Sequence, residues 1–440
     1  MSLINKISNR RFFANLSWMT MQKIVQLSSS LVVGIVLARY LGASDYGTYS
    51  LLLALTTILS TVSTFGLNHL VTKEIKLSNQ DSFNIISNAI LIRFIAAIFL
   101  APIFFLIYRY AGESDYLYVV LVVLLLQCFN SFKVVEFYFL SKSDMKPYVT
   151  VNIVALLSSV LAKIVMVVMQ VELKYFLLLV GGDYVFMGLL SLYVYNRSKG
   201  SVSTPWLNSR VFGDLVKKGL PLAFSSLTAV IYLKMDVIML SYYVPKESVG
   251  HYAVAARLSE IWYILPGLLM AAVFPKLLEL KKSSCSLYHS GIDRLLYFMV
   301  LSSFLLIVFI TVFSEFIVYT LFGEQFLPSV DILQIHIWAS IFIFMRAVVS
   351  KWLIAEDLYY LSLVTHGVGA ISNIILNLLM IPELGAKGAA YATLVSYGLA
   401  SYVSLFLTKD GWPMAARMTW AFLLPTYFVR VKNRVAADKI

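Results

Sequence analysis

Long apolar runs separated by short polar segments follow one another along the whole chain. A helix needs about 20 apolar residues to cross the hydrocarbon core of a bilayer, and the runs lack the alternation in about ten-residue segments that is typical of membrane barrels. The pattern therefore predicts an all-α integral membrane protein with about 12 transmembrane helices. The expected spans lie near 15–40, 44–70, 84–109, 116–140, 147–170, 175–196, 214–243, 247–275, 295–321, 329–354, 359–381 and 386–408.

Composition supports this reading and excludes a separate soluble domain. Of the 440 residues, 60% are hydrophobic and 13% are charged, whereas soluble domains have roughly 45–50% apolar and 25% charged residues. Cys128 and Cys285 have no spacing that suggests a metal site or a disulfide. The first run continues for about 25 residues without a small-residue cleavage pattern, so we expect a retained span and not a signal peptide.

Lysine and arginine in the connections predict the orientation, because positively charged loops resist translocation. Of the 35 Lys and Arg, seven fall within spans, and five lie in outer loops if the N-terminus is inside. The other 23 lie in inner segments. Both termini are therefore expected in the cytoplasm. The net charge of +12 follows largely from this topology, so no nucleic-acid partner is expected.

The segment RYLGASDYGTYS at 39–50 has a counterpart about two hundred residues later. A shift of 203 places Gly47-Thr48-Tyr49 on Gly250-His251-Tyr252 without a gap, which indicates an internal repeat. A shift of 214 aligns spans 4–5 with spans 10–11, although there most matched residues are apolar and chance similarity is a serious alternative. We expect Gly42 to permit a tight turn and Gly47 to permit close helix approach.

The repeat predicts two six-helix lobes related by a pseudo-twofold axis along the membrane normal, with a central cavity between them. The predicted parts are an N-terminal lobe at 1–200, a C-terminal lobe at 201–410, and an interfacial helix with a basic tail at 411–440. Segment 412–429 is apolar but short, and an interfacial helix is expected there instead of a further span.

Charged residues within the spans are the candidate functional residues, because a charge at the bilayer centre costs about 2.5–3.5 kcal/mol on insertion scales. Seven cations against four acids leave a positive surplus, and a cavity holding it would attract an anion. The cations are Lys23, Arg93, Lys133, Lys163, Lys234, Arg257 and Arg346, and the acids are Glu136, Asp183, Asp236 and Glu260.

Each charge also has a structural interpretation. Lys133 and Glu136 lie near a span end, where snorkelling favours a structural role. Arg257 and Glu260 are three apart and could neutralise one another. For Arg93 the cavity and interface readings are even.

Two further positions are distinguished by their place on a helix. Lys23 continues into Gln26 and Ser30 at helical spacing, and this polar stripe favours the cavity reading. Lys234 and Asp236 are two positions apart, so they face different directions and a simple ion pair is not expected.

The motifs of enzymes are not found in the sequence. There is no phosphate-binding glycine loop, no metal-ligand cluster and no nucleophile elbow. The five histidines are scattered. We therefore expect no enzyme activity, no cofactor and no metal.

Four segments together resemble the polysaccharide flippases of the multidrug/oligosaccharidyl-lipid/polysaccharide exporter superfamily, specifically the bacterial O-antigen flippases (Wzx-type). Their order and spacing carry the resemblance more than any single motif, and with twelve spans it covers nearly the whole chain. The segments are LARYLGASDYGTYSL at 37–51, FGLNHLVTKE at 65–74, KMDVIMLSYYVPKESVGHYAVAARL at 234–258 and GAKGAAYATLVSYG at 385–398.

The resemblance implies an inner-membrane protein of lipopolysaccharide biosynthesis. It would move a polyprenyl-pyrophosphate-linked oligosaccharide from the cytoplasmic to the periplasmic leaflet by alternating access. The family's cationic cavity would contain Lys23, Lys234 and Arg257, with Arg93 as a further candidate. Asp183, Asp236 and Glu260 are candidates for coupling to a proton or sodium gradient, because they are acids within spans. Besides membrane lipids, a polysaccharide polymerase and a chain-length regulator are the implied partners.

Other functions remain as alternatives. Related flippases move capsule, exopolysaccharide or peptidoglycan precursors, and the last group usually has two further spans. Drug-exporting relatives carry mostly cationic compounds, for which a cation-rich cavity has the wrong sign. A membrane-embedded polysaccharide polymerase would be expected to have a sizeable external loop or an acidic catalytic motif, and the sequence has neither.

Overall fold

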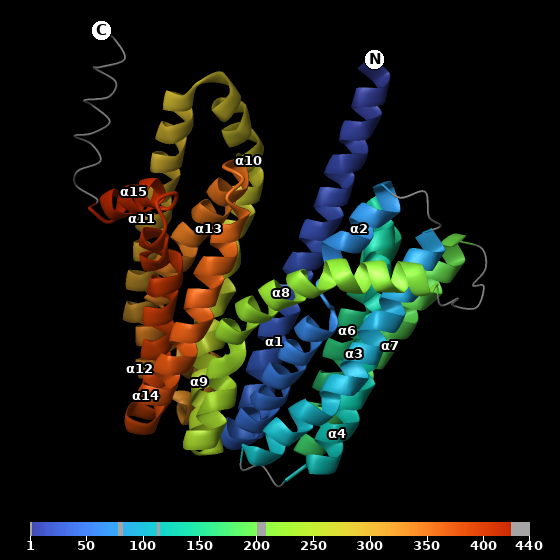
Figure 1. Ribbon diagram of the computed structural model, residues 1–440. Coiled ribbons are helices and arrows are strands. Elements are labelled where there is room, and N and C mark those ends of the chain that lie inside the picture. Colours follow the sequence, from blue (N-terminus) through green and yellow to red (C-terminus); the bar gives the residue numbers. More distant parts are fainter. Residues whose placement is uncertain (1, 78–81, 112–114, 200–207, 424–440) are drawn as a thin grey trace. The chain divides into compact units, whose positions relative to one another are not determined.

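The computed structural model describes residues 2–77, 82–111, 115–199 and 208–423, and no strand occurs in these ranges. Two compact units can be distinguished, Met1–Gly250 and His251–Ile440. The helices of the first unit (Figure 1) are α1 Ser2–Ser63, α2 Leu67–Leu77, α3 Ser82–Tyr110, α4 Leu117–Leu126, the 3₁₀ helix η1 Gln127–Val134, α5 Val135–Lys142, α6 Lys146–Val168, α7 Leu173–Lys199 and α8 Ser209–Tyr243.

The second unit is helical as well. Helix α9, Lys246–Glu260, begins in the first unit and continues into the second. The remaining elements are η2 Ile261–Tyr263, α10 Ile264–Ser283, α11 Cys285–Phe322, η3 Glu324–Phe326, α12 Ser329–His336, α13 Ala339–Ala355, α14 Tyr359–Ser401, η4 Val403–Leu407 and α15 Trp412–Phe422. The two units are defined by packing, whereas the predicted lobes are defined by the internal repeat. The units therefore do not test the lobe boundaries, which stay a prediction.

Nine helices in the described ranges are long and apolar enough to cross a membrane, or ten if a bent pair within α8 is one span. Two of the nine contain a non-helical glycine, Gly42 in α1 and Gly385 in α14. These glycines lie where turns are predicted between spans 1 and 2 and between spans 11 and 12. The φ of 76° at Gly42 confirms the predicted turn, because L-residues with a side chain rarely adopt it. The count of twelve stays a prediction.

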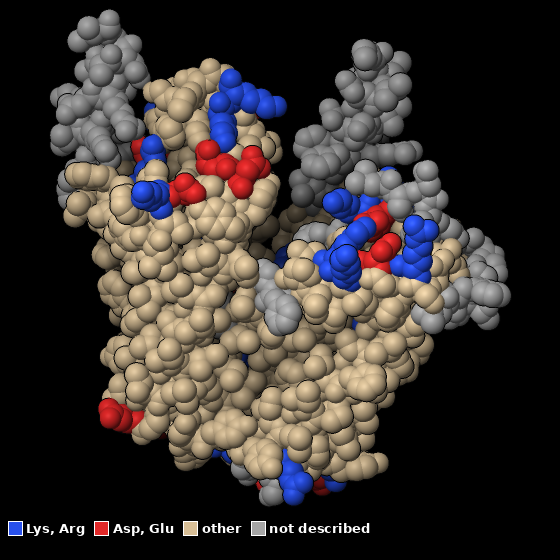
Figure 2. Space-filling view, viewed as in Figure 1, with Lys and Arg blue, Asp and Glu red and all other residues tan. Residues whose placement is uncertain are grey.

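The surfaces of these helices suit a lipid environment. On the visible face, Lys, Arg, Asp and Glu gather toward the helix ends, and the band between them shows almost none (Figure 2). Large apolar side chains along α11 are exposed, among them Phe298, Leu305, Val312 and Phe316. In lipid, a helix exposes such residues without penalty. The protein is therefore a multi-pass membrane protein.

Reciprocal glycine contacts join α1 to the start of α9. A Cβ atom on Gly47 would overlap the backbone carbonyl of Lys246, and one on Gly250 would overlap that of Ala43. The shift of 203 that matches Gly47 with Gly250 also matches Ala43 with Lys246. The two segments therefore pack with local twofold symmetry, as in an isologous interface. The contact confirms that Gly47 permits close helix approach.

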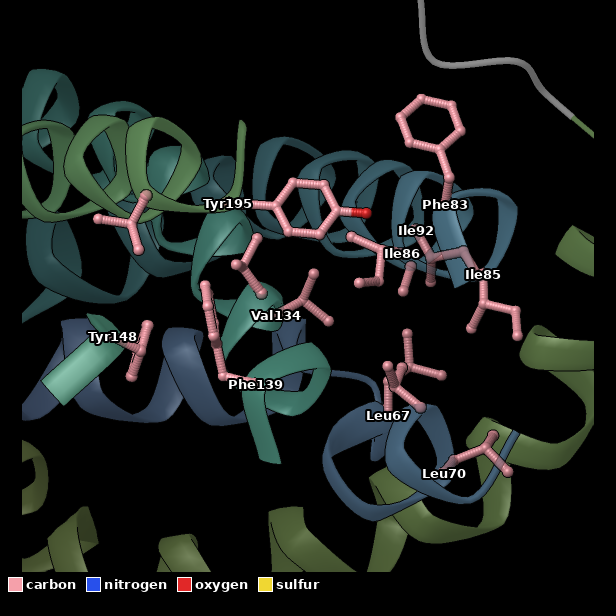
Figure 3. Close-up of a cluster of buried hydrophobic side chains, with 14 of the residues drawn as sticks. Leu67, Leu70, Phe83, Ile85, Ile86, Ile92, Val134, Phe139, Tyr148 and Tyr195 are labelled. Carbon is pink, nitrogen blue, oxygen red and sulfur yellow. The ribbon is translucent and has the colours of Figure 1, made fainter. Parts of the chain in front are cut away.

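A buried apolar cluster stabilises the first unit around α2, α3, α5, α6 and α7. The ring of Phe139 stacks on that of Tyr148 with centroids 6.3 Å apart, and the two rings join α5 to α6. Because lipid is as apolar as these side chains, close packing and not exclusion from water holds such helices together. The labelled members in Figure 3 are Leu67, Leu70, Phe83, Ile85, Ile86, Ile92, Val134, Phe139, Tyr148 and Tyr195.

The predicted interfacial segment begins with helix α15. Its 11 residues are too few to span a bilayer. Met414, Ala415, Met418 and Ala421 are buried and belong to the apolar core of the second unit. Residues 424–440 lie outside the described ranges, so the interfacial location and the basic tail stay predictions.

Candidate functional site

A polar cavity of about 410 Å³ lies within the first unit. Its volume falls within the 300–1,000 Å³ typical of small-ligand sites. Helix α1, the η1–α5 junction, α6 and α7 contribute its walls, so residues far apart in the sequence meet there. The lining residues are Met19, Gln22, Lys23, Gln26, Lys133, Glu136, Tyr148, Asn152, Ala155, Leu156, Ser159, Asp183, Tyr184 and Met187.

Helix α1 supplies two members of the polar stripe that the sequence predicts, and the third, Ser30, is not among the lining residues. Lys23 and Gln26 both line the cavity, together with Gln22 one position earlier. The Lys23 Nζ donates a hydrogen bond of 3.4 Å to the Gln26 Oε1. Residues three and four apart share a helix face, so one turn of α1 presents an ammonium group and two amides to the cavity. The sequence places Lys23 in a cavity between two lobes, whereas this cavity lies within the first unit, so its role in substrate binding stays a prediction.

A second polar stripe, which we define as Gln127, Asn130, Lys133 and Glu136, follows η1 into α5, and its last two members line the cavity. In a 3₁₀ helix, residues three apart lie on one face, and η1 carries the first three members. The Gln127 Nε2 donates to the Thr56 carbonyl at 2.5 Å, and the Asn130 Nδ2 to the Ser60 Oγ at 2.7 Å. This stripe therefore faces the inside of the unit.

Lys133 and Glu136, for which the sequence favours a structural role at a span end, instead line the cavity. The Lys133 Nζ lies over the Tyr184 ring, 5.9 Å from its centroid, a distance at which a cation is attracted by the ring. Glu136 lies in the first turn of α5. The signal that points to both residues is the three-residue period of polar side chains in an otherwise apolar span.

Asp183 on α7 is held by a buried ion pair with α6. The Lys163 Nζ lies 2.7 Å from the Asp183 Oδ2 and donates to the Ser159 Oγ at 2.6 Å. The Ser159 hydroxyl in turn donates to Asp183 at 2.8 Å. Only 9% of the Lys163 side chain is exposed, against 31% of the Asp183 side chain. Lys163 therefore neutralises Asp183, one of the acids proposed from the sequence for ion coupling.

The charges near the cavity leave a positive surplus. With Asp183 matched by Lys163, Glu136 is the remaining acid of the lining, against Lys23 and Lys133. The lining also contains neutral hydrogen-bonding groups, namely the hydroxyls of Tyr148 and Tyr184 and the amide of Asn152. Such a site can bind an anion together with hydroxyl-rich neighbouring groups.

Arg93 is not among the residues that line this cavity. Its side chain is 4% exposed, and its Nη2 donates to the Asn68 Oδ1 at 2.5 Å. The guanidinium carbon lies 5.7 Å from the centroid of the Phe137 ring. The Nε is buried and has no hydrogen-bond partner in the described part of the chain. Arg93 thus acts electrostatically on Glu136 without lining the cavity, and a role in binding stays a prediction.

The other predicted site residues lie on α8 and α9. Asp236 is 3% exposed and Lys234 is partly exposed, and the expectation that they form no simple ion pair stays a prediction. Neither lines the cavity described above. Arg257 and Glu260 lie in the last turn of α9, within the second unit. Their roles in substrate binding and ion coupling stay predictions.

A second polar cluster is buried within the second unit. The Ser259 Oγ and His336 Nδ1 lie 2.5 Å apart, and the Tyr263 hydroxyl lies 3.4 Å from the same nitrogen. The Tyr252 hydroxyl and Thr393 Oγ1 are 3.3 Å apart. These bonds join α9, η2, α12 and α14. Among the residues searched, which are those the structure describes, no group of three His, Cys, Asp or Glu could hold a metal.

Comparison with known proteins relates the chain to polysaccharide pathways. A family model described as "Polysaccharide biosynthesis protein" matches residues 12–281. The probable low-salt glycan biosynthesis flippase Agl15 of Haloferax volcanii is 25% identical over 421 residues, which cover 88% of this chain and 84% of that protein.

Solved structures share the fold. The lipid II flippase MurJ in an inward closed conformation superposes with a TM-score of 0.70 at 15% identity, over 93% of this chain and 92% of that chain. An inward-facing multidrug resistance MATE family transporter of the MOP superfamily gives 0.71 at 13% identity, over 92% and 99%. At these identities the likeness concerns the fold alone. Because the family model spans more than half of the sequence, the chain belongs to the polysaccharide biosynthesis protein family, and its fold is that of MOP-superfamily transporters.

Proposed function

We propose that the protein is a flippase that moves a polyprenyl-pyrophosphate-linked O-antigen repeat unit from the cytoplasmic to the periplasmic leaflet of the bacterial inner membrane. The observation that carries the proposal is the cavity in the first unit, which presents Lys23 and Lys133 within an apolar bundle. Relatives whose names describe flippases of glycan biosynthesis and of lipid II support a lipid-linked saccharide as the cargo. These relatives are named as transporters, which favours transport over enzyme activity.

The geometry suggests how the headgroup would bind. Hydrogen bonds between ammonium groups and phosphate oxygens are charge-assisted and stabilise by about 1.5–3 kcal/mol each. Lys23 and Lys133 would bind the pyrophosphate, while Asn152 and the tyrosine hydroxyls would bind sugar hydroxyls. The polyprenyl tail would stay in lipid, because it is apolar.

Transport would follow by alternating access of two repeat-related halves. The cycle would be driven by a substrate gradient or an ion gradient. Asp236 and Glu260 remain the predicted coupling acids, together with Asp183 unless its role is to neutralise Lys163. Lys234 and Arg257 remain predicted members of the cationic site.

Complementation of a strain that lacks its own flippase gene tests this function. Alanine substitution of Lys23, Lys133, Lys234 or Arg257 should reduce surface polysaccharide while leaving protein insertion intact. Lys276→Ala is the matched control, because Lys276 pairs with Glu279 at a site where both side chains are 69% exposed. Unchanged polysaccharide in all four variants would refute the anionic headgroup site.

The same strain separates flipping from polymerisation. In the deletion strain, lipid-linked units should accumulate on the inner leaflet. Normal flipping with unpolymerised units would instead indicate the polymerase alternative. Restoration of capsule or exopolysaccharide but not of O-antigen would redirect the proposal to another lipid-linked saccharide.

A further inference from the structure

Glu136 is the feature of the cationic cavity that the proposed function does not use. A site for an anionic headgroup gains no affinity from a carboxylate, yet Glu136 lines the cavity beside Lys133. It is the last member of the polar stripe that begins at Gln127. Its position therefore needs an explanation other than direct binding of an anion.

Three cations on three different elements interact electrostatically with this carboxylate. Lys133 lies three residues before it, Lys23 belongs to α1 and Arg93 to α3, and all three interact with it electrostatically. The Tyr148 hydroxyl on α6 is its neutral polar neighbour. Glu136 thus shares the cavity with Lys23 and Lys133 and is also within electrostatic reach of Arg93.

The two acids of the cavity are held differently. Asp183 lies 2.7 Å from the Lys163 Nζ and accepts a second bond from Ser159. Glu136, in the described part of the chain, forms no ion pair within 4.0 Å. Asp183 is therefore matched to one cation, whereas Glu136 is shared loosely among several.

We infer that Glu136 is an internal counter-anion of the headgroup site, which limits the affinity for a diphosphate so that the cargo can leave. In the ligand-free state its charge offsets clustered cations, which are costly in a low-dielectric bundle. When a diphosphate binds to the same cations, the carboxylate repels it. A transport site must bind strongly enough to load and weakly enough to release, and Glu136 sets that balance. This inference rests on the proposed function of the cavity.

The experiment measures binding and transport with the same variants. Full-length protein in lipid nanodiscs is titrated with farnesyl pyrophosphate and inorganic pyrophosphate, and farnesol serves as the uncharged lipid control. Glu136→Gln should bind farnesyl pyrophosphate about ten-fold more tightly, a change of ~1.4 kcal/mol, and should export less polysaccharide. Glu136→Asp keeps the charge and should remain within a few-fold of the unmodified protein in both assays. Melting temperatures verify that both variants are folded.

A loss of packing at Glu136 would weaken binding and transport together, so tighter binding with slower export distinguishes the counter-anion role. Unchanged or weaker binding in Glu136→Gln overturns the inference. If Lys133→Gln nevertheless weakens pyrophosphate binding, the headgroup site is supported although the inferred role of Glu136 is not. If neither pyrophosphate binds the unmodified protein, the headgroup site and the role of Glu136 fail together. Binding of inorganic pyrophosphate with the same gain in Glu136→Gln assigns the effect to the diphosphate and not to the lipid tail.

Discussion

Removing one partner of the Lys163–Asp183 pair should destabilise the protein strongly, and the cost should depend on which partner remains. Breaking a buried pair costs about 3–5 kcal/mol, because an uncompensated charge is left behind. In Asp183→Asn that charge is Lys163, whose side chain is 9% exposed. We expect a loss of about 3 kcal/mol, which lowers the folding equilibrium constant by roughly a hundred-fold.

The reverse change should cost less. Lys163→Met leaves Asp183, whose side chain is 31% exposed and which still accepts a hydrogen bond from Ser159. We expect a loss of about 1–2 kcal/mol, typical of a missing hydrogen bond to a charged group. The double variant Lys163→Met/Asp183→Asn contains no buried charge at this site and should recover most of the stability. Both single variants and the double variant form a double-mutant cycle.

Reversible unfolding in mixed detergent micelles, followed by circular dichroism, measures these free energies. The reasoning is refuted if Asp183→Asn is within about 0.5 kcal/mol of the unmodified protein, or if the double variant is no more stable than Asp183→Asn. Export of polysaccharide by the double variant separates two roles of Asp183. Retained export indicates that Asp183 acts by neutralising Lys163, whereas loss of export from a stable double variant favours ion coupling.

Two further predictions concern helix packing. Gly47→Ala should destabilise the protein by about 1–3 kcal/mol, because its Cβ would overlap the rigid carbonyl of Lys246. The control Gly213→Ala places its Cβ in open space and should be neutral or slightly stabilising. Equal melting temperatures of the two variants would contradict the close approach at Gly47. Arg417→Ala should loosen α15 from α11 by removing the 2.5 Å ion pair with Asp293, at a cost of about 1–3 kcal/mol. Faster proteolysis within α15 is the measurement, and an unchanged cleavage rate would show that apolar contacts alone hold this helix.

The polar stripe shows how local structure changes the interpretation of a sequence. On an α-helix, positions three apart drift around the axis, so Gln127, Asn130, Lys133 and Glu136 give no compact face over three turns. On the 3₁₀ helix η1 the first three members line up on one side, and Glu136 follows in the first turn of α5. Hydropathy alone reads the segment as an ordinary span with charges near its end, and this is why Lys133 and Glu136 are assigned there to snorkelling.

The turn at Gly42 and the close approach at Gly47 were easier to predict, because they depend on backbone chemistry. Glycine is the residue that permits both a positive φ and close helix approach. Gly42 and Gly47 therefore carried structural information that did not depend on their neighbours. The internal alignment could not predict that the matched segments contact each other at Ala43–Gly47 and Lys246–Gly250. A sequence repeat does not specify which surfaces of its two copies pack together.

The sequence by itself determined that this chain is a helical, multi-pass membrane protein and predicted where most of its spans and turns lie. It could do so because the bilayer requires apolar runs of sufficient length, which is a property of single segments. Only the tertiary structure decided that Lys23, Lys133, Glu136 and Asp183 share one cavity, whose lining does not include Arg93. That grouping depends on how each helix is rotated about its axis. In lipid no hydrophobic difference fixes the rotation, so it is set by close packing between side chains far apart in the sequence.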